Sequence, residues 1–214
     1  MAGDGIASVS GGFQFTQDWF AQNIAVWDKL VPRYTPKKIL EVGSFEGRSA
    51  CYFIEKCAAE REIELHCVDS WQGGIEHDRA AMSAVEARFN HNVALAQTRA
   101  AHKVKLVKHK SLSGAALAKL IVVDPVGTFD VIYIDGSHQA PDVLTDAVMA
   151  FQLLRVGGLM IFDDYLWSME PMGKQDPLNM PKPAIDAFIN IFQRKMFVVR
   201  GAPVYQLFAT KAFA

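Results

Sequence analysis

The fold is decided by residues 37–50, which read Lys-Lys-Ile-Leu-Glu-Val-Gly-Ser-Phe-Glu-Gly-Arg-Ser-Ala. An apolar run that contains Glu41 stops at Gly43, and a helical pattern without glycine or proline begins after Gly47. This order predicts a strand, a tight turn and a helix, because glycine takes positive φ freely and lets a ligand lie against bare backbone. In an open α/β sheet, a turn of this kind borders the ligand crevice.

The spacing of these two glycines argues against a dinucleotide cofactor. The dinucleotide fingerprint has a third glycine at the position that Phe45 occupies here, and that glycine lets a pyrophosphate approach the backbone. Glu41, just before the first glycine, would suit a ligand end that carries an amine. A tight turn with close helix packing explains the two glycines equally well, and both interpretations stay open at this point.

Composition sets the broad class of the protein. The chain has 214 residues, 50% hydrophobic and 21% charged, which suits one sizeable globular domain. Its formal net charge of −1 gives no pull toward nucleic acid or an anionic membrane. We expect a cytoplasmic protein, because residues 1–12 lack a signal-peptide pattern and no apolar run approaches the ~18 residues of a membrane span. Cys51, Cys57 and Cys67 lack CxxC spacing and predict buried thiols in a reducing compartment.

Strand and helix patterns alternate along the chain and predict one α/β domain with a mostly parallel sheet. Residues 1–36 are expected to form a loose tail and a capping helix over 13–31, and residues 37–214 the main domain. The capping helix either covers the sheet edge or roofs the site, and its apolar load would also suit a homodimer contact. The later elements are strands at 62–69, 103–109, 129–135 and 159–164, helices at 76–101, 111–120, 141–154 and 184–194, an irregular stretch at 165–182, and a closing hairpin of 196–200 with 204–210.

Polar residues follow the second and third predicted strands. Asp69 lies 22 positions after Gly47, at the place where a carboxylate holds a ribose diol in nucleotide-binding sheets. Trp71 follows it and is placed to cover an adenine face. Ser111 is either a contact on the adenine side or the N-cap of the next helix.

Three carboxylates reach one sheet edge from two strands that we expect to be neighbours: Asp135, Asp163 and Asp164. Unpaired, they would repel and raise at least one pKa, and a hard divalent cation such as Mg²⁺ would remove that cost. Asp163 and Asp164 can reach one ion only if the strand ends between them. The alternative is that one of them caps a turn. His138, three positions after Asp135, is placed to accept a hydroxyl proton.

The runs Ile-Leu-Glu-Val-Gly-Ser-Phe-Glu-Gly at 39–47, Asp-Gly-Ser-His at 135–138 and Phe-Asp-Asp-Tyr at 162–165, together with Asp69, carry a resemblance. The chain resembles the class I S-adenosylmethionine-dependent methyltransferases over residues 37–165. Within them it is most similar to the branch of the macrocin- and mycinamicin-type sugar O-methyltransferases. The resemblance implies a Rossmann-like, doubly wound, seven-stranded sheet that ends in an antiparallel hairpin.

The resemblance also implies a set of site residues. S-adenosylmethionine would lie over the glycine turn, a Mg²⁺ ion would be held by Asp135, Asp163 and Asp164, and His138 with Asp135 would be catalytic. The residues expected to contact the cofactor are Glu41, Gly43, Ser44, Phe45, Gly47, Ser49, Asp69, Ser70, Trp71, Ser111 and Asp135.

We therefore expect an S-adenosylmethionine-dependent methyltransferase that carries out Mg²⁺-dependent O-methylation of a small molecule, such as a sugar or another natural product. The alternatives are an S-adenosylmethionine-binding protein without transfer activity and an NAD-dependent oxidoreductase, which Phe45 disfavours. No nucleic-acid or membrane partner is expected. The acceptor pocket is expected to be shaped by Trp19, Trp27, Tyr165, Trp167, Met169, Met172 and Met180.

Overall fold

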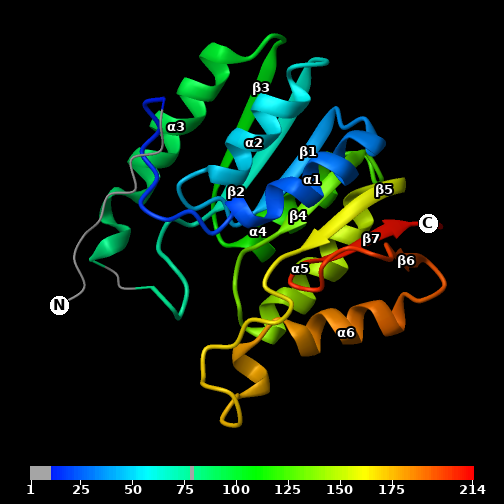
Figure 1. Cartoon of the computed structure of the whole chain (residues 1–214). Coiled ribbons are helices and arrows are strands. Elements are labelled where there is room, and N and C mark those ends of the chain that lie inside the picture. Colours follow the sequence, from blue (N-terminus) through cyan, green and yellow to red (C-terminus); the bar gives the residue numbers. More distant parts are fainter. Residues whose placement is uncertain (1–10, 78–79) are drawn as a thin grey trace.

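A computed structural model describes residues 11–77 and 80–214 of the chain (Figure 1). Its centre is a seven-stranded sheet in the order β3-β2-β1-β4-β5-β7-β6. The first five strands are parallel, and β7 runs antiparallel to both β5 and β6. The predicted doubly wound fold with antiparallel C-terminal strands is confirmed. The strands are β1 Lys38–Val42, β2 Ile63–Asp69, β3 Val104–Lys110, β4 Phe129–Ile134, β5 Leu154–Phe162, β6 Met196–Val198 and β7 Leu207–Lys211.

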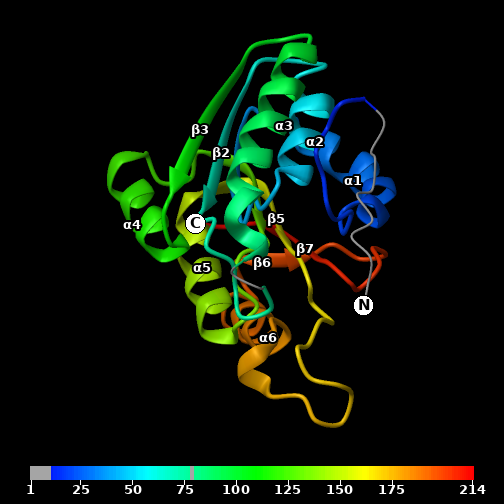
Figure 2. The same ribbon diagram turned by 90° about the vertical axis from the view of Figure 1, so that its left-hand side faces the viewer.

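Helices cover both faces of this sheet, and each face has its own hydrophobic core (Figure 2). Residues of α1, α2 and α3 fill one core, whereas residues of α4, α5 and α6 fill the other. The central strands β1 and β4 contribute to both cores and are buried almost throughout, as strands between two helical layers must be. The helices are α1 Ile24–Leu30, α2 Arg48–Cys57, α3 Val85–Arg99, α4 Ser113–Val123, α5 Ala140–Leu153 and α6 Lys182–Ile191.

Short 3₁₀ segments complete the described helical structure: Ala21–Asn23, Val31–Tyr34, Ala81–Ala84 and Pro177–Asn179. Across residues 11–77 and 80–214, no helix combines the length and the apolar character that crossing a bilayer requires. The three cysteines are free and buried, as predicted.

Two predicted helices begin later in the structure than expected. Residues 13–19 are not helical, and Thr16 binds the buried Glu46 carboxylate through its N–H and its hydroxyl (2.6 and 2.7 Å). The helix expected from 76 begins only at 81, although residues 78–79 of that stretch, like 1–10 of the expected tail, lie outside the described residues. Asn92 is buried inside α3, which runs unbroken through this position.

Residues 155–158, which separate the expected helix 141–154 from the expected strand 159–164, are instead part of β5. The strand starts at Leu154, and its register against β4 shifts between Phe129 and Val131, which marks a β-bulge. Gly157 takes a φ of +75° within this irregular stretch. The glycine pair therefore bends a strand and does not end one. The C-terminal strands pair as predicted, but their connection is longer than expected.

Helix α1 packs against the sheet through Trp27. Trp27 is fully buried, and its ring packs edge-on against Tyr133 of β4 at a centroid distance of 4.9 Å. Its indole N–H donates to Oε1 of Gln206 (2.8 Å), and the amide of Gln206 donates to Asp163 (2.9 Å). A chain of hydrogen bonds thus joins the N-terminal helix to a carboxylate at the end of β5. Trp27 therefore packs the helix against the sheet and does not form a roof over the site.

Replacing Trp27 by phenylalanine tests this support. The ring remains, but Oε1 of the buried Gln206 loses its donor, which we expect to lower the free energy of unfolding by about 1–3 kcal/mol. Trp19→Phe is the matched control, because Trp19 is 59% exposed and its change should stay within about 0.5 kcal/mol. Urea denaturation of both variants measures the difference, and equal losses would contradict the assigned role of the indole hydrogen bond.

Candidate functional site

A cleft of ≈ 1750 Å³ opens where the parallel strands reach their carboxyl ends. This volume is large enough for a nucleoside cofactor together with a small second molecule. Most of the residues predicted for the site line it: Gly43, Ser44, Phe45, Ser49, Asp69, Ser70, Trp71, Ser111, Asp135, His138, Asp163 and Asp164. Glu41 and Gly47 lie behind its wall.

Gly43 makes the closest approach in the site. Its φ is +86°, and a Cβ there would lie 1.9 Å from the backbone oxygen of Asp135. Its N–H donates to the carbonyl of Val68 in β2 (2.9 Å). Only glycine fits here, and the ends of β1, β2 and β4 are consequently locked together at the cleft.

Gly47 allows close helix packing, the second interpretation of the glycine turn. Its φ is +80°, and a Cβ there would lie 3.0 and 3.2 Å from the side chains of Phe89 and Val93 in α3. Close helix packing is therefore the correct interpretation for Gly47, which forms the N-cap of α2. Of the two predicted glycines, Gly43 alone lines the cleft.

Asp69 fastens the glycine bend to the end of β2. Its Oδ2 accepts from the N–H groups of Ser44 (3.0 Å) and Phe45 (2.8 Å), and its Oδ1 accepts from the N–H of Trp71 (2.6 Å). Phe45 has a φ of +44°, a left-handed conformation that residues other than glycine seldom adopt. Asp69 lines the cleft, and its contact with a ribose stays a prediction.

Trp71 and Ser111 flank this end of the cleft. Trp71 is only 5% exposed, packs against Phe89 and donates its indole N–H to the carbonyl of Phe45 (2.9 Å), so little of its ring is free to cover an adenine. The N–H of Ser111 donates to the carbonyl of Asp69 (3.0 Å). The N-cap of α4 is Leu112, so the expectation that Ser111 caps this helix is wrong.

Glu41 is hydrogen-bonded to one serine of the glycine bend and to one serine of α2. It is fully buried, and its two oxygens accept from the hydroxyls of Ser44 (2.5 Å) and Ser49 (2.6 Å). Burial raises its pKa to about 7, against the lowering effect of these hydrogen bonds. The structure does not place Glu41 against a ligand amine as expected, because the two serines stand between its carboxylate and the cleft.

We call Asp135, Asp163 and Asp164 the carboxylate edge, because they follow the paired strand ends Ile134 and Phe162. The Tyr133 hydroxyl contacts Oδ2 of Asp135 (2.8 Å) and Oδ2 of Asp163. Burial raises the pKa of both acids, and the charge of the neighbouring carboxylates raises it further.

Strand β5 ends at Phe162, before both consecutive aspartates, whereas the strand was expected to run to Asp164. Asp164 has a φ of +53°, which turns the chain after Asp163. The alternation of side chains that would send the two carboxylates to opposite faces therefore does not apply. The two aspartates consequently reach the same edge through a turn.

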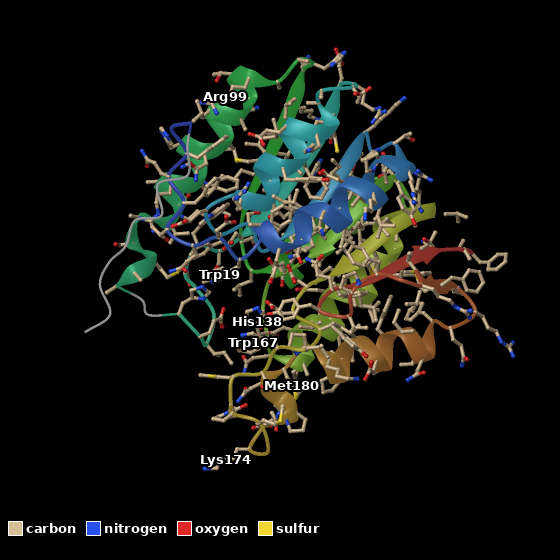
Figure 3. All side chains as sticks on the ribbon, in the orientation of Figure 1. Trp19, Arg99, His138, Trp167, Lys174 and Met180 are labelled. Atoms are coloured by element: carbon tan, nitrogen blue, oxygen red, sulfur yellow. The ribbon has the colours of Figure 1, made fainter. Side chains whose placement is uncertain are left out.

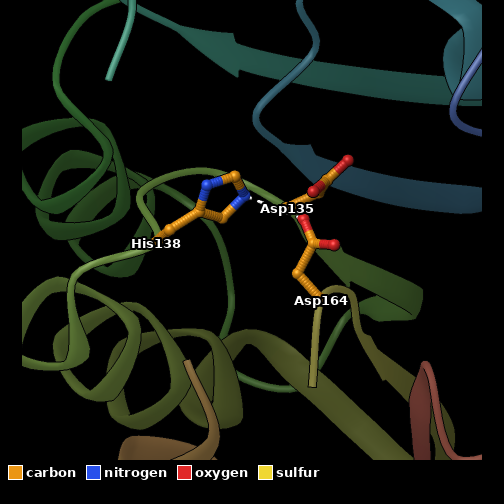
Figure 4. Close-up of side chains that lie close together, drawn as sticks. All are labelled: Asp135, His138 and Asp164. Carbon is orange, nitrogen blue, oxygen red and sulfur yellow. Dashed lines mark ion pairs between the residues drawn. The ribbon is translucent and has the colours of Figure 1, made fainter. Parts of the chain in front are cut away.

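His138 joins the carboxylate edge (Figure 4). Its Nε2 lies 2.8 Å from Oδ2 of Asp164, and its Nδ1 lies 3.5 Å from a carboxylate oxygen of Glu76. Burial lowers its pKa, but Asp164 and Glu76 outweigh this effect and raise it to about 10. The imidazole is therefore positively charged at neutral pH in this arrangement and holds the negative carboxylates together.

The compact set of metal-ligating atoms differs from the predicted one. Within the described part of the chain, Asp135, His138 and Asp164 each offer a ligand atom, and these atoms lie within 4.8 Å of one another. Asp163 is engaged instead by Tyr133, by Gln206 and by the N–H of Asp164. The structure brings all three predicted carboxylates to one edge, but it puts His138 in the place expected for Asp163.

Two aromatic residues expected to shape the acceptor pocket do line the cleft (Figure 3). The ring of Trp167 lies 4.4 Å from that of His138, and the ring of Trp19 lies 5.2 Å from that of Phe45. The expectation is wrong for Trp27, which belongs to the core. The segment with Met172 and Met180 projects away from the sheet in both ribbon views, and the cleft lining does not include Tyr165, Met169, Met172 or Met180.

Several site residues carried no signal in the sequence. Glu76 lies in a loop, and Gln206 lies far along the chain near a strand end. Tyr133 looks like an ordinary buried strand residue until its hydroxyl is placed between two aspartates. Asp146 lies inside a helix, and only its burial shows it to be unusual.

The comparisons with known proteins agree with this geometry. The family described as "Methyltransferase domain" matches residues 40–165, more than half of the chain. The chain belongs to this family and is a methyltransferase of the S-adenosylmethionine-dependent class. A search of the curated proteins found no match.

Solved structures show the same fold at low sequence identity. A Klebsiella pneumoniae structure assigned to the O-methyltransferases is 20% identical, with a TM-score of 0.62, over 92% of this chain and 83% of that one. The O-methyltransferase TomG from Streptomyces achromogenes is 17% identical, with a TM-score of 0.58, over 90% and 81%. The MycE methyltransferase of mycinamycin biosynthesis is 16% identical, with a TM-score of 0.61, over 92% of this chain and 51% of that one.

Gly43→Ala tests the close approach at the bend. The added Cβ would overlap a backbone carbonyl at a positive φ, so the free energy of unfolding should fall by at least about 3 kcal/mol. Gly114→Ala is the control, because a Cβ there meets no atom within 4 Å, and its stability should be unchanged or up to about 1 kcal/mol higher. Chemical denaturation compares them. A Gly43→Ala protein as stable as the parent would show that the bend is not constrained.

Glu41 predicts a pH dependence of stability. Its pKa is raised from 4.5 to about 7 in the folded chain, so the folded state binds more protons between these values and stability falls as pH rises. The loss is complete above pH 7 and amounts to roughly 3 kcal/mol. Urea titrations from pH 4.5 to 8 should show a smaller fall for Glu41→Gln than for the parent. Parallel curves would remove Glu41 as a source of this dependence.

Proposed function

We propose that the chain transfers the methyl group of S-adenosylmethionine to a hydroxyl of a small molecule, with the help of Mg²⁺ or a similar divalent cation. The observation that carries this proposal is the junction of the glycine bend with the carboxylate edge in one cleft. A methyl donor over the bend and a hydroxyl at the edge would therefore be neighbours. Such alignment alone lowers a displacement barrier by several kcal/mol.

The cofactor is proposed to follow the cleft from the bend to the end of β3. Its methionine end would lie over Gly43 and Ser44, and its ribose would meet the Asp69 carboxylate. The base would then extend toward Ser111, whose backbone is hydrogen-bonded to that of Asp69. Two structural neighbours support this choice of ligand, because TomG was solved with S-adenosylmethionine and MycE with S-adenosylhomocysteine.

The residues fit a hard cation. Three carboxylates meet at one edge, and burial and mutual repulsion raise the pKa values of Asp135 and Asp163, a cost that a cation between them would remove. Asp135, Asp163 and Asp164 would hold the ion, and His138 beside them would remain unligated. A bound cation would lower the pKa of an acceptor hydroxyl. MycE, a structural neighbour, was solved with Mg and, in another crystal, with Mg and mycinamycin VI.

His138 is the residue proposed to take the hydroxyl proton, at Nε2, which faces the carboxylate edge. His138 can accept this proton only in its neutral form. The negative charges of Asp164 and Glu76, which raise its pKa, would therefore have to be compensated when substrate is bound. Glu76 on the other side of the ring keeps it oriented.

The acceptor is proposed to be a hydroxylated small molecule such as a sugar or another natural product. Trp167 beside His138 and Trp19 beside Phe45 give the cleft apolar walls on either side of the reaction edge. The alternative, a binding protein without transfer activity, explains neither the buried acids nor the imidazole that faces them. A homodimer stays a prediction.

Formation of S-adenosylhomocysteine from S-adenosylmethionine, with a panel of hydroxylated acceptors, tests the proposal. Asp164→Asn should lower kcat by about 100-fold or more while the Kd for S-adenosylhomocysteine stays within threefold. Asp186→Asn, on α6 and paired with Lys182, is the control and should keep full activity. EDTA should abolish turnover and Mg²⁺ should restore it. Turnover that ignores EDTA would remove the metal, and failure to bind S-adenosylhomocysteine would remove the function.

A further inference from the structure

The connection between β6 and β7 reaches the carboxylate edge, and one of its residues has no role in the chemistry above. The connection comprises residues 199–206, and the strand that follows it begins opposite the end of β5, with Leu207 paired to Phe162. Because β7 runs antiparallel to β5, the connection arrives beside the turn that follows β5. Its last two residues, Tyr205 and Gln206, therefore lie at the carboxylate edge.

These two residues each bind one of the consecutive aspartates. The side-chain amide of Gln206 donates to Oδ2 of Asp163 (2.9 Å), and the phenol of Tyr205 donates to Oδ1 of Asp164 (2.8 Å). Gln206 is buried and is also bound by Trp27, so the core holds it in place. Tyr205 is 38% exposed, lines the cleft and belongs to neither hydrophobic core. Packing therefore does not explain why its hydroxyl lies at Asp164.

The backbone around Asp164 is fixed, but its side chain needs a further contact. Asp164 has a φ of +53°, and its carbonyl accepts from the N–H of Trp167 (2.9 Å). On such a backbone, rotation about χ1 still has three staggered wells, which point the carboxylate in three directions. The hydrogen bond from the Tyr205 hydroxyl selects one of them. This contact therefore fixes the direction in which the carboxylate points.

The selected direction presents one oxygen of Asp164 to the site. Because Oδ1 is held by Tyr205, Oδ2 is left to face His138, whose Nε2 lies 2.8 Å away. Asp135 and Asp164 offer ligand atoms within 4.8 Å of one another at this place. The protein thus holds one oxygen of the carboxylate and leaves the other toward the proposed metal position.

We propose that Tyr205 is a positioning residue for the divalent cation, because its hydroxyl holds the Asp164 carboxylate in the orientation that ligates the ion. The inference rests on the metal of the proposed function. Groups that hydrogen-bond to a metal ligand orient that ligand, and their loss typically weakens metal binding about 10- to 100-fold. Tyr205 acts through Asp164 and does not itself contact the ion.

A purely structural role is the alternative, in which the hydroxyl only fastens the β6–β7 connection. That connection is already fastened by backbone hydrogen bonds. The N–H of Tyr165 donates to the carbonyl of Tyr205 (3.0 Å), and the N–H of Val199 donates to the carbonyl of Phe208 (2.8 Å). The hydroxyl therefore adds little to the anchoring of the connection, and its main effect falls on Asp164.

Titration of the full chain with Mn²⁺ alone, with the free ion measured by electron paramagnetic resonance, tests the inference. Tyr205→Phe keeps the ring and removes the hydroxyl, so the Kd for Mn²⁺ should rise about 10-fold or more. The Kd for S-adenosylhomocysteine, measured without metal by calorimetry, should stay within about twofold. Tyr34→Phe is the matched control and should keep the parental Kd for Mn²⁺, because its hydroxyl contacts Thr210 at the other end of β7 (2.7 Å).

The two ligands separate positioning of the ion from a structural role. The melting temperature of Tyr205→Phe should stay within about 2 °C of the parental value, since the residue is partly exposed. An unchanged Kd for Mn²⁺ would overturn the inference and leave the proposed function standing. The same holds if both ligands bind more weakly and the melting temperature falls with them. If the parent binds S-adenosylhomocysteine but no Mn²⁺, the inference and the proposed metal are both wrong, and the cofactor proposal stands.

Discussion

The contact between Gly43 and the backbone of Asp135 is the constraint on which the rest of the site depends. It brings the chain segments that follow β1 and β4 closer together than any side chain would allow, and the Gly43 N–H adds the end of β2. Since β5 pairs with β4 up to Phe162, the acids that follow both strands are carried to the same place. The close approach of these two backbone segments, and not an attraction between side chains, therefore brings the glycine bend and the carboxylate edge into one cleft.

The electrostatics of the cleft follow from this convergence. Glu41, Asp135, Asp146 and Asp163 are all acids whose pKa is raised, in each case chiefly because they are buried. The chain supplies serine, tyrosine and glutamine donors to Glu41, Asp135 and Asp163. His138 gives the edge its positive charge. The site is therefore organised for ligands that bring positive charge or hydrogen-bond donors.

Much of this arrangement could be predicted from the sequence, and the remainder depends on contacts between distant segments. The strands and the glycine bend follow from local periodicity and from the conformational freedom of Gly43, and the acids at strand ends follow from the parallel order. Local pattern could not show that Thr16 binds Glu46 or that Trp27 faces the core. Each of these depends on residues far away in the chain.

The methyl donor and the metal are proposed to share one cleft, and paramagnetic relaxation measures their proximity directly. With Mn²⁺ in place of Mg²⁺ and no acceptor present, the S-methyl protons of bound S-adenosylmethionine should relax much faster than in the Mg²⁺ sample. Asp164→Asn should remove most of this effect by weakening the ion's site, while the nucleoside stays bound. If Mn²⁺ and the cofactor both bind to the parent protein and the methyl relaxation stays at its Mg²⁺ value, the two sites are separate and the claim is wrong.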